Sequence, residues 1–219
     1  MPPPRIILAD DHAIVLDAFR KLLEPTYDVV ATVTNGQALL AAARRLKPDL
    51  IVADIAMPQL NGLDACQQLK AMAPNVGLVL ITANEDPEMA MEAIRRGASG
   101  YVLKKSASSE LFDAIKQVLA GRHYITPCIS KDPSAVFMAR ARKAHLSPTL
   151  TLRQREVLQL LAEGRSMKEA ADILHVTPRT IAFHKYGMME QLHVKTSAEL
   201  VQCAMNMGLI MRKDSSPTA

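Results

Sequence analysis

Three carboxylates, a hydroxyl and an ammonium follow short apolar segments in the first half of the chain. Each group stands at the end of an apolar run of about four residues: Asp10 with its neighbour Asp11, Asp54, Thr82 and Lys104. If these runs are neighbouring parallel strands, their carboxyl ends meet at one edge of a sheet, about 4.8 Å from strand to strand. We therefore expect the five side chains to line a small acidic cup.

The types of group in this cup suit phosphoryl chemistry. Carboxylates that lie close together repel one another unless a cation offsets their charge, and hard oxygen ligands with room for water favour Mg²⁺. A carboxylate is a weak nucleophile, so phosphoryl transfer to it needs a metal ion and an ammonium that neutralise the phosphoryl oxygens. The alternative for any single aspartate is that it caps the following helix or faces solvent.

Five strand–helix units would position the cup. The predicted strands are 5–9, 28–33, 50–53, 77–82 and 100–103. A periodicity of 3.6 residues predicts helices at 13–23, 37–46, 62–72, 87–96 and 109–120. This alternation within about 120 residues predicts an α/β domain with a five-stranded, parallel, doubly wound sheet.

The pattern changes after residue 120. Three prolines interrupt the segment up to residue 150, which we interpret as a linker with one helix over 135–144. Four helices are predicted beyond it, at 152–163, 167–174, 178–192 and 197–207. Thr151, Ser166 and Thr196 each precede a Gln or Glu by three residues, as in a capping box, and Thr177 precedes a proline at a helix start.

The predicted helix 178–192 has an unusual outward face. At about 100° of rotation per residue, Ile181, Met188 and Leu192 fall on one side and should pack inward. The opposite side combines charged, small and aromatic residues: Arg179, Ala182, Phe183, Tyr186 and Glu190. Exposed rings beside an arginine indicate a surface that contacts another molecule, and a helix after a tight turn can enter a DNA major groove.

Composition limits the class of protein. The 219 residues are 49% hydrophobic and 22% charged, without an apolar run of membrane-spanning length and without the pattern of a signal peptide. We therefore expect a globular, cytoplasmic protein of one or two domains. The three cysteines lack paired spacing, which argues against a disulfide framework or a zinc site.

The basic charge is concentrated in the second part of the chain. Residues 1–125 carry 13 basic and 14 acidic side chains, whereas residues 126–219 carry 13 and 8. A basic segment of this kind is compatible with nucleic acid, an acidic partner or a charged membrane surface, and charge alone does not choose among them.

The first 120 residues resemble the receiver domain of bacterial response regulators, which has a flavodoxin-like fold. The resemblance is carried by 8–12 (LADDH), 54–62 (DIAMPQLNG), 82–83 (TA) and 100–104 (GYVLK). It implies that Asp54 accepts a phosphoryl group, that Thr82 and Lys104 hold the phosphoryl oxygens, and that Thr82 and Tyr101 act as a switch. The implied Mg²⁺ ligands are Asp10, Asp11, Asp54 and the carbonyl of Ala56. We interpret His12 as a surface or capping residue.

The last part of the chain resembles the LuxR-type helix-turn-helix domain of the NarL/FixJ subfamily. The resemblance is carried by 152–158 (LRQREVL), 162–164 (AEG), 180–184 (TIAFH) and 208–210 (GLI). It implies that helix 178–192 enters the major groove and that helix 197–207 supports a dimer. The candidate DNA contacts are Thr177, Arg179, Thr180, Ala182, Phe183, His184, Lys185 and Tyr186.

Together these resemblances predict a transcription regulator of a two-component system. A sensor histidine kinase would phosphorylate Asp54, and the chain, as a homodimer, would then bind double-stranded DNA, with RNA polymerase as a further candidate partner and no membrane. We expect no enzyme activity beyond its own phosphoryl transfer and hydrolysis. The predicted boundaries are 1–122 for the receiver, 123–147 for the linker, 148–212 for the all-α helix-turn-helix domain and 213–219 for a disordered tail.

Two alternatives stay open at the level of the sequence. A regulator that acts through protein contacts without DNA binding is compatible with Ala182, Tyr186 and Gly187, which differ from the residues usual in the family. An Mg²⁺-dependent aspartyl-phosphate phosphatase of the haloacid dehalogenase type also uses an aspartate nucleophile. That class needs a second acid two residues after the nucleophile, where this chain has Ala56.

Overall fold

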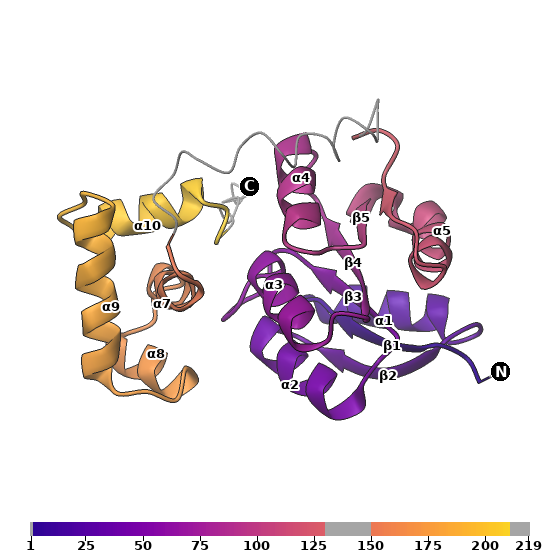
Figure 1. The fold of residues 1–219 in the computed structure, drawn as a ribbon, viewed down its shortest axis with the longest axis horizontal. Helices are drawn as coiled ribbons and strands as arrows, with labels where there is room; N and C mark the ends of the chain where they lie inside the picture. The colour runs from indigo at the N-terminus through magenta and orange to yellow at the C-terminus, as the bar shows by residue number, and fades with distance from the viewer. Residues whose placement is uncertain (1, 130–149, 211–219) are drawn as a thin grey trace, which may run out of the picture. The chain divides into compact units, whose positions relative to one another are not determined.

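The computed structural model describes residues 2–129 and 150–210, and the chain divides into two compact units between residues 146 and 147 (Figure 1). The helix predicted at 135–144 and the tail predicted at 213–219 lie outside the described residues. Among the described helices, none has the length and hydrophobicity needed to cross a membrane.

The first unit alternates strands and helices, as the hydrophobic periodicity predicts. In chain order its elements are β1 (Arg5–Ala9), α1 (Ala13–Leu23), β2 (Asp28–Val33), α2 (Gly36–Leu46), β3 (Leu50–Asp54), α3 (Gly62–Met72), β4 (Gly77–Thr82), α4 (Pro87–Arg95), β5 (Gly100–Leu103), a 3₁₀ turn at Lys104–Ser106, α5 (Ala107–Leu119) and β6 (Tyr124–Ile125). All neighbouring strands are parallel, in the order β2-β1-β3-β4-β5-β6.

The five predicted strands are confirmed, and β6 is a sixth strand that the sequence did not indicate. Gly100 and Tyr101 of β5 pair with Tyr124 and Ile125. Beyond β6, the Thr126 amide donates to the Tyr101 carbonyl at 2.9 Å. Residues 124–126 therefore extend the sheet of the first unit, although the sequence analysis predicted a linker there. Two residues are too few to show the alternation that marks a strand.

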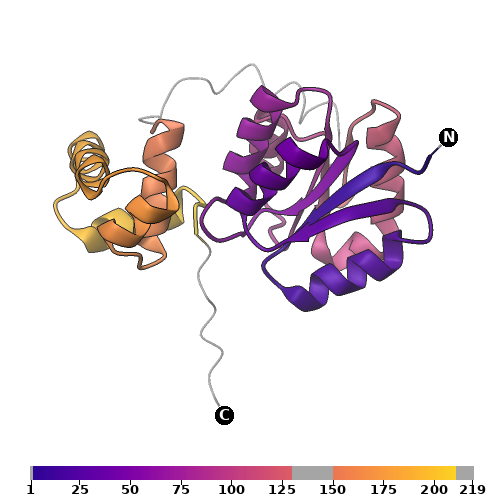
Figure 2. The same ribbon diagram turned by 90° about the horizontal axis from the view of Figure 1, so that it is seen from below.

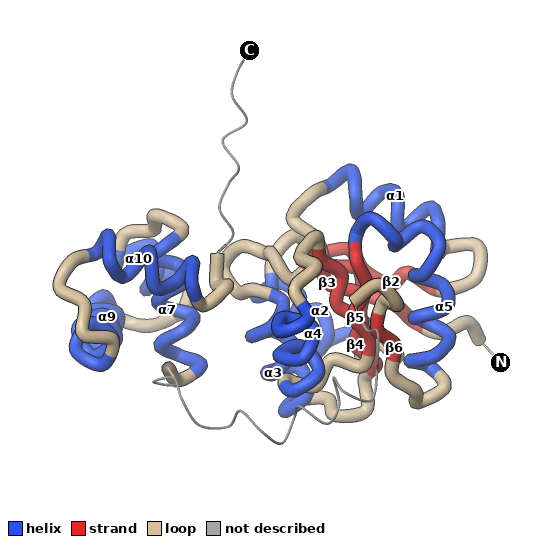
Figure 3. The backbone as a smooth tube through the Cα atoms, turned by 90° about the horizontal axis from the view of Figure 1, so that it is seen from above, coloured by secondary structure: helices blue, strands red, loops and turns tan. Residues whose placement is uncertain are grey.

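Helices cover both faces of this sheet (Figures 2 and 3). On one face α1 and α5 pack against the core that contains Ile6, Leu8 and Val102, whereas on the other α2, α3 and α4 pack against the core that contains Ile7 and Leu80. Every residue of β3 is buried. A central parallel strand that is covered on both faces is apolar along its length. In β3 the polar residue, Asp54, is therefore at the carboxyl end.

The second unit consists of α7 (Leu152–Ala162), α8 (Met167–Ile173), α9 (Pro178–Gln191) and α10 (Ser197–Asn206). The three predicted capping boxes at Thr151, Ser166 and Thr196 are all present with both of their hydrogen bonds. Thr177 caps α9 by accepting from the Thr180 amide at 3.2 Å. The four helices enclose a separate apolar core that includes fully buried Ile181 and Met188.

Candidate functional site

The acidic cup forms at the carboxyl ends of β1, β3 and β4. Asp10 and Asp54 are 2% and 3% exposed, and Thr82 is fully buried. Lys104, at the end of β5, donates from Nζ to Asp10 Oδ2 and to Asp54 Oδ2, each at 2.8 Å. The lysine therefore holds two buried carboxylates together, which fits the predicted gathering of charges at this edge.

Burial and charge act against each other in this cluster. Burial raises the pKa of Asp54, and the hydrogen bond and charge of Lys104 offset only part of that effect. Burial alone would lower the pKa of Lys104, but its bonds to Asp10 and Asp54 raise that pKa above its ordinary value. The three carboxylates of the cup carry more negative charge than the single ammonium of Lys104 can neutralise. This excess of negative charge favours binding of a further cation.

The carboxylates offer a donor set for that cation. One ligand atom each from Asp10, Asp11, His12 and Asp54 lies within 4.8 Å of the others. Three of these donors are hard carboxylate oxygens, the ligands that suit Mg²⁺, and the exposed side of the group leaves room for water. Asp10, Asp11 and Asp54 therefore fit a magnesium ion by their chemistry.

His12 has a role that the sequence did not indicate. It is exposed, as expected, but its side chain does not cap α1. Instead its Nδ1 lies 2.8 Å from Asp11 Oδ1 and 3.0 Å from Asp10 Oδ1. The ring thus bridges the two neighbouring aspartates, a contact whose only sequence signal is the position of His12 directly after them.

The loop between β3 and α3 fixes the orientation of Asp54. Its carboxylate accepts a hydrogen bond from the Ala56 amide, and the Gly62 amide donates to the Ile55 carbonyl at 2.8 Å. A Cβ at position 62 would lie 2.3 Å from the Asp54 carbonyl oxygen. Glycine is therefore required where the loop returns against the end of β3.

A buried polar network holds the far side of this loop. Asn61 caps α3 by accepting from the Asp64 amide at 2.9 Å, and its Nδ2 donates to Asp64 Oδ2 at 2.8 Å. Asp64 is fully buried and forms an ion pair with Arg96, just after α4. No local sequence pattern predicts this network, because the ion pair joins positions 32 residues apart.

The two predicted switch residues are joined through Asn84. The Asn84 amide donates to Thr82 Oγ1 at 3.0 Å, and the Tyr101 hydroxyl donates to the Asn84 carbonyl at 3.0 Å. Tyr101 is fully buried, and burial raises the pKa of its hydroxyl. The loop after β4 therefore connects the hydroxyl of the cup to a buried ring on β5.

Tyr101→Phe should lower the free energy of unfolding by about 0.5–1.5 kcal/mol, the net contribution of a typical hydrogen bond. The ring would still fill its site, but the Asn84 carbonyl would lose the donor that it has in the structure. Urea denaturation of the variant and wild type measures this difference. Equal midpoints and slopes would show that the hydroxyl does not hold the loop.

The candidate DNA contacts lie along α9 in the second unit. Phe183 and Tyr186 are 75% and 63% exposed, as the helical projection predicted. Lys185 Nζ donates to Ser197 Oγ at the start of α10, at 3.2 Å. The half-buried His184 ring contacts Phe183 edge-on, with 5.6 Å between ring centroids. The remaining candidates belong to the N-cap and the first turns of α9: Thr177, Arg179, Thr180 and Ala182.

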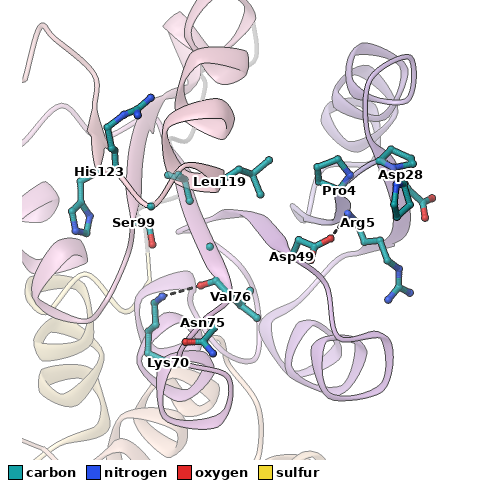
Figure 4. A pocket seen from close by; sticks show the side chains of 16 residues that line it. Pro4, Arg5, Asp28, Asp49, Lys70, Asn75, Val76, Ser99, Leu119 and His123 are labelled. Atoms are coloured by element: carbon teal, nitrogen blue, oxygen red, sulfur yellow. Dashed lines mark hydrogen bonds between the residues drawn. The ribbon is translucent and has the colours of Figure 1, made fainter.

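A separate pocket of about 820 Å³ lies at the amino ends of the strands (Figure 4). Lys70 Nζ, which lines it, donates to the Val76 carbonyl at 2.8 Å, and the Arg5 amide donates to Asp49 Oδ2 at 2.7 Å. This pocket is at the opposite end of the strands from the acidic cup, and its lysine is engaged by backbone carbonyls. The acidic cup is therefore the better candidate for phosphoryl chemistry.

Each of the two units matches a known protein family. Residues 6–116 match the response regulator receiver domain, and residues 148–204 match the bacterial regulatory proteins of the luxR family. The transcriptional regulatory protein MctR of Rhizobium johnstonii is 32% identical over 216 residues, which cover 96% of this chain and 97% of the relative. The oxygen regulatory protein NreC of Staphylococcus aureus is 31% identical over 214 residues, which cover 94% and 99%.

A solved structure is similar over most of the chain. RcsB from Salmonella enterica serovar Typhimurium, bound to the promoter P1flhDC in the presence of the phosphomimetic BeF₃⁻, is 26% identical with a TM-score of 0.56. The match covers 91% of this chain and 97% of the RcsB chain. These likenesses confirm the two resemblances found in the sequence, and the chain therefore belongs to the NarL/FixJ-type response regulators, which join a receiver domain to a luxR-family DNA-binding domain.

Proposed function

We propose that a sensor histidine kinase transfers a phosphoryl group to Asp54, and that this modification controls how the second unit binds double-stranded DNA. The observation that carries the proposal is the position of Lys104 Nζ, 2.8 Å from Asp54 and 2.8 Å from Asp10. An ammonium fixed between two buried carboxylates is placed to neutralise a phosphoryl group that arrives at one of them.

In the proposed transfer, an Asp54 carboxylate oxygen attacks the phosphorus of a phosphohistidine on the kinase. A P–O bond to Asp54 forms as the P–N bond breaks, and the imidazole leaves with the bonding electron pair. Lys104 would move its hydrogen bond from the carboxylate to a phosphoryl oxygen, and Thr82 would donate its hydroxyl to another. Mg²⁺, held by Asp10, Asp11, Asp54 and the Ala56 carbonyl, would supply further positive charge.

The phosphoryl acceptor can be identified directly. After incubation with acetyl phosphate and Mg²⁺, borohydride reduction and peptide mass spectrometry should locate the acyl phosphate at Asp54. A phosphoryl group on Asp10, Asp11 or any other residue would contradict the assignment. Turnover is proposed to be limited to this transfer and to hydrolysis of the acyl phosphate, so sustained release of phosphate from simple phosphomonoesters would favour the phosphatase alternative instead.

The DNA-binding part of the proposal rests on α8 and α9. Residues 174–177 separate the two helices, and α9 begins with a capped first turn and carries Arg179 on its outer side. A helix that follows such a short connection fits the major groove, and RcsB, the similar solved structure, is bound to a promoter. We propose that α9 contacts base edges and that α10 contributes to a homodimer.

Arg179→Ala should weaken binding of the full-length chain to DNA, because the exposed guanidinium is the cation nearest the start of α9. Loss of a phosphate contact would lower affinity for all sequences and reduce the salt slope by about 1, whereas loss of a base contact would cost about 1–3 kcal/mol on the preferred sequence. Fluorescence anisotropy at several salt concentrations separates the two cases. Arg95→Ala, on α4, removes the same charge from the first unit and should leave DNA affinity unchanged. Equal affinities for Arg179→Ala and Arg95→Ala would remove Arg179 from the interface.

A further inference from the structure

Two aromatic rings are exposed on the helix that the proposed function places against DNA. Phe183 and Tyr186 of α9 are 75% and 63% exposed, although the same helix fully buries Ile181 and Met188 on its other side. Large apolar side chains that lie together on a surface usually mark a contact with another molecule.

The rings belong to a continuous surface, here called the α9 stripe, formed by Arg179, Ala182, Phe183 and Tyr186. The spacing of three, four and seven residues places these side chains on adjacent turns of one helical face. Arg179 is at the amino-terminal end, and the exposed Glu190 follows at the other end. A carboxylate repels the phosphate backbone, so the part of α9 suited to DNA is its first two to three turns.

The centre of the α9 stripe lacks groups that can read a base by hydrogen bonding. Neither Ala182 nor Phe183 has a side-chain donor or acceptor. The neighbouring Lys185 lies outside this centre: its Nζ donates to Ser197 Oγ at 3.2 Å and is 6.0 Å from the centroid of the Tyr186 ring. The half-buried His184 ring packs edge-on against Phe183. Discrimination by Ala182 and Phe183 themselves must therefore come from apolar contact.

We infer that the α9 stripe recognises thymine through its 5-methyl group, with Phe183 as the residue that contacts it. The thymine methyl is the apolar group that base edges present in the major groove, and it distinguishes thymine from cytosine and from the purines. This inference rests on the proposed function, in which α9 enters that groove. Burial of one methyl group against a ring corresponds to roughly a fourfold gain in affinity.

Deoxyuridine provides a direct test, because it lacks only the 5-methyl group and keeps the hydrogen-bonding edge of thymine. A duplex is first selected by the full-length chain, with BeF₃⁻ and Mg²⁺, from a random-sequence library. The same duplex is then made with thymine or with uracil, and both affinities are measured by anisotropy. Wild type should bind the uracil duplex about fourfold more weakly for each methyl group contacted.

The Phe183→Ala variant completes a double-mutant cycle, in which the residue at position 183 and the 5-methyl group of the base are each removed alone and together. The variant should bind the thymine duplex about as weakly as wild type binds the uracil duplex, and it should no longer distinguish the two. Phe183→Leu is the matched control, since it keeps an apolar side chain and should retain part of the preference for thymine. The salt slope should be unchanged in both variants because no phosphate contact is lost. Their circular dichroism spectra should match that of wild type, because both substitutions are at an exposed position.

The remaining outcomes separate the inference from the proposed function. Equal wild-type affinity for both duplexes would overturn the inference while DNA binding stands. A thymine preference that persists in Phe183→Ala would also overturn it, by assigning the methyl contact to another residue. Failure to select any duplex would contradict the proposed function itself. A change in oligomeric state on Phe183→Ala, with no change in thymine preference, would identify the α9 stripe as a protein interface.

Discussion

Asp54→Asn should abolish phosphorylation by acetyl phosphate, the largest functional effect expected from a single substitution in this chain. The amide has nearly the shape of the carboxylate and can still accept a hydrogen bond from Lys104, but it has no anionic oxygen to attack phosphorus. Phosphate-affinity electrophoresis of the intact protein measures the fraction modified. Asp113→Asn, which removes an exposed carboxylate on α5, should be modified like wild type. Modification of Asp54→Asn to the wild-type extent would disprove the assignment of the acceptor.

The same substitution should stabilise the metal-free protein at neutral pH. Burial raises the pKa of Asp54, so the folded state favours the protonated carboxyl and is weakened when that group ionises. The wild-type protein should therefore lose stability relative to Asp54→Asn as pH rises from below the ordinary value of 3.8 through the raised folded-state pKa. The two proteins should differ least at the acidic end of a urea-denaturation series. A variant less stable than wild type at pH 7 would contradict this account of the cup.

Lys104→Met should produce the largest loss of stability in the cup, because it leaves Asp10 and Asp54 buried without their cation. Removing one partner of a fully buried pair costs roughly 3–5 kcal/mol, and because the Lys104 side chain is 25% exposed we expect about 2–3 kcal/mol. Added Mg²⁺ should recover part of this loss by offsetting the same carboxylates. Lys104→Arg keeps the charge and should be less destabilised than Lys104→Met. Urea denaturation with and without Mg²⁺ makes both comparisons.

The pH dependence of the Lys104 interaction has the same sign as that of Asp54, because both folded-state pKa values are raised, but it falls at the alkaline end of the pH range. Its bonds raise the Lys104 pKa above the ordinary value of 10.5. While the carboxylates are ionised, the pair therefore contributes its full stabilisation up to pH 10.5, and that contribution is lost as pH rises through the higher folded-state pKa. At neutral pH the difference between wild type and Lys104→Met should be fully expressed. Equal unfolding free energies for the two proteins at pH 7 would show that Lys104 does not stabilise the cup.

The features that could be predicted from the sequence are those set by neighbouring residues. The capping boxes at Thr151, Ser166 and Thr196 involve positions three residues apart, and all three form as the sequence indicates. Strands β1 to β5 follow from apolar runs between helical segments, and their parallel arrangement brings Asp10, Asp54 and Lys104 together. Exposure of Phe183 and Tyr186 follows from helical rotation alone.

The features that could not be predicted depend on distant or very short segments. The network of Asn61, Asp64 and Arg96 requires α3 and the end of α4 to meet, which no local pattern specifies. Strand β6 has only two residues, which is too short for an alternation of apolar and polar residues to be recognised. The contact of His12 with both Asp10 and Asp11 depends on the rotamers adopted at the start of α1. Side-chain geometry of this kind becomes visible only once the fold is known.

One comparison of affinities tests whether the state of Asp54 controls DNA binding. The full-length chain and Asp54→Asn are titrated into a selected duplex, each with Mg²⁺ alone and with Mg²⁺ and BeF₃⁻. Coupling between two sites typically amounts to 1–3 kcal/mol, so BeF₃⁻ should raise the wild-type affinity about 5- to 150-fold and leave Asp54→Asn unchanged. Equal wild-type affinities with and without BeF₃⁻, under conditions where BeF₃⁻ is bound at Asp54, would contradict the claim that this residue controls DNA binding.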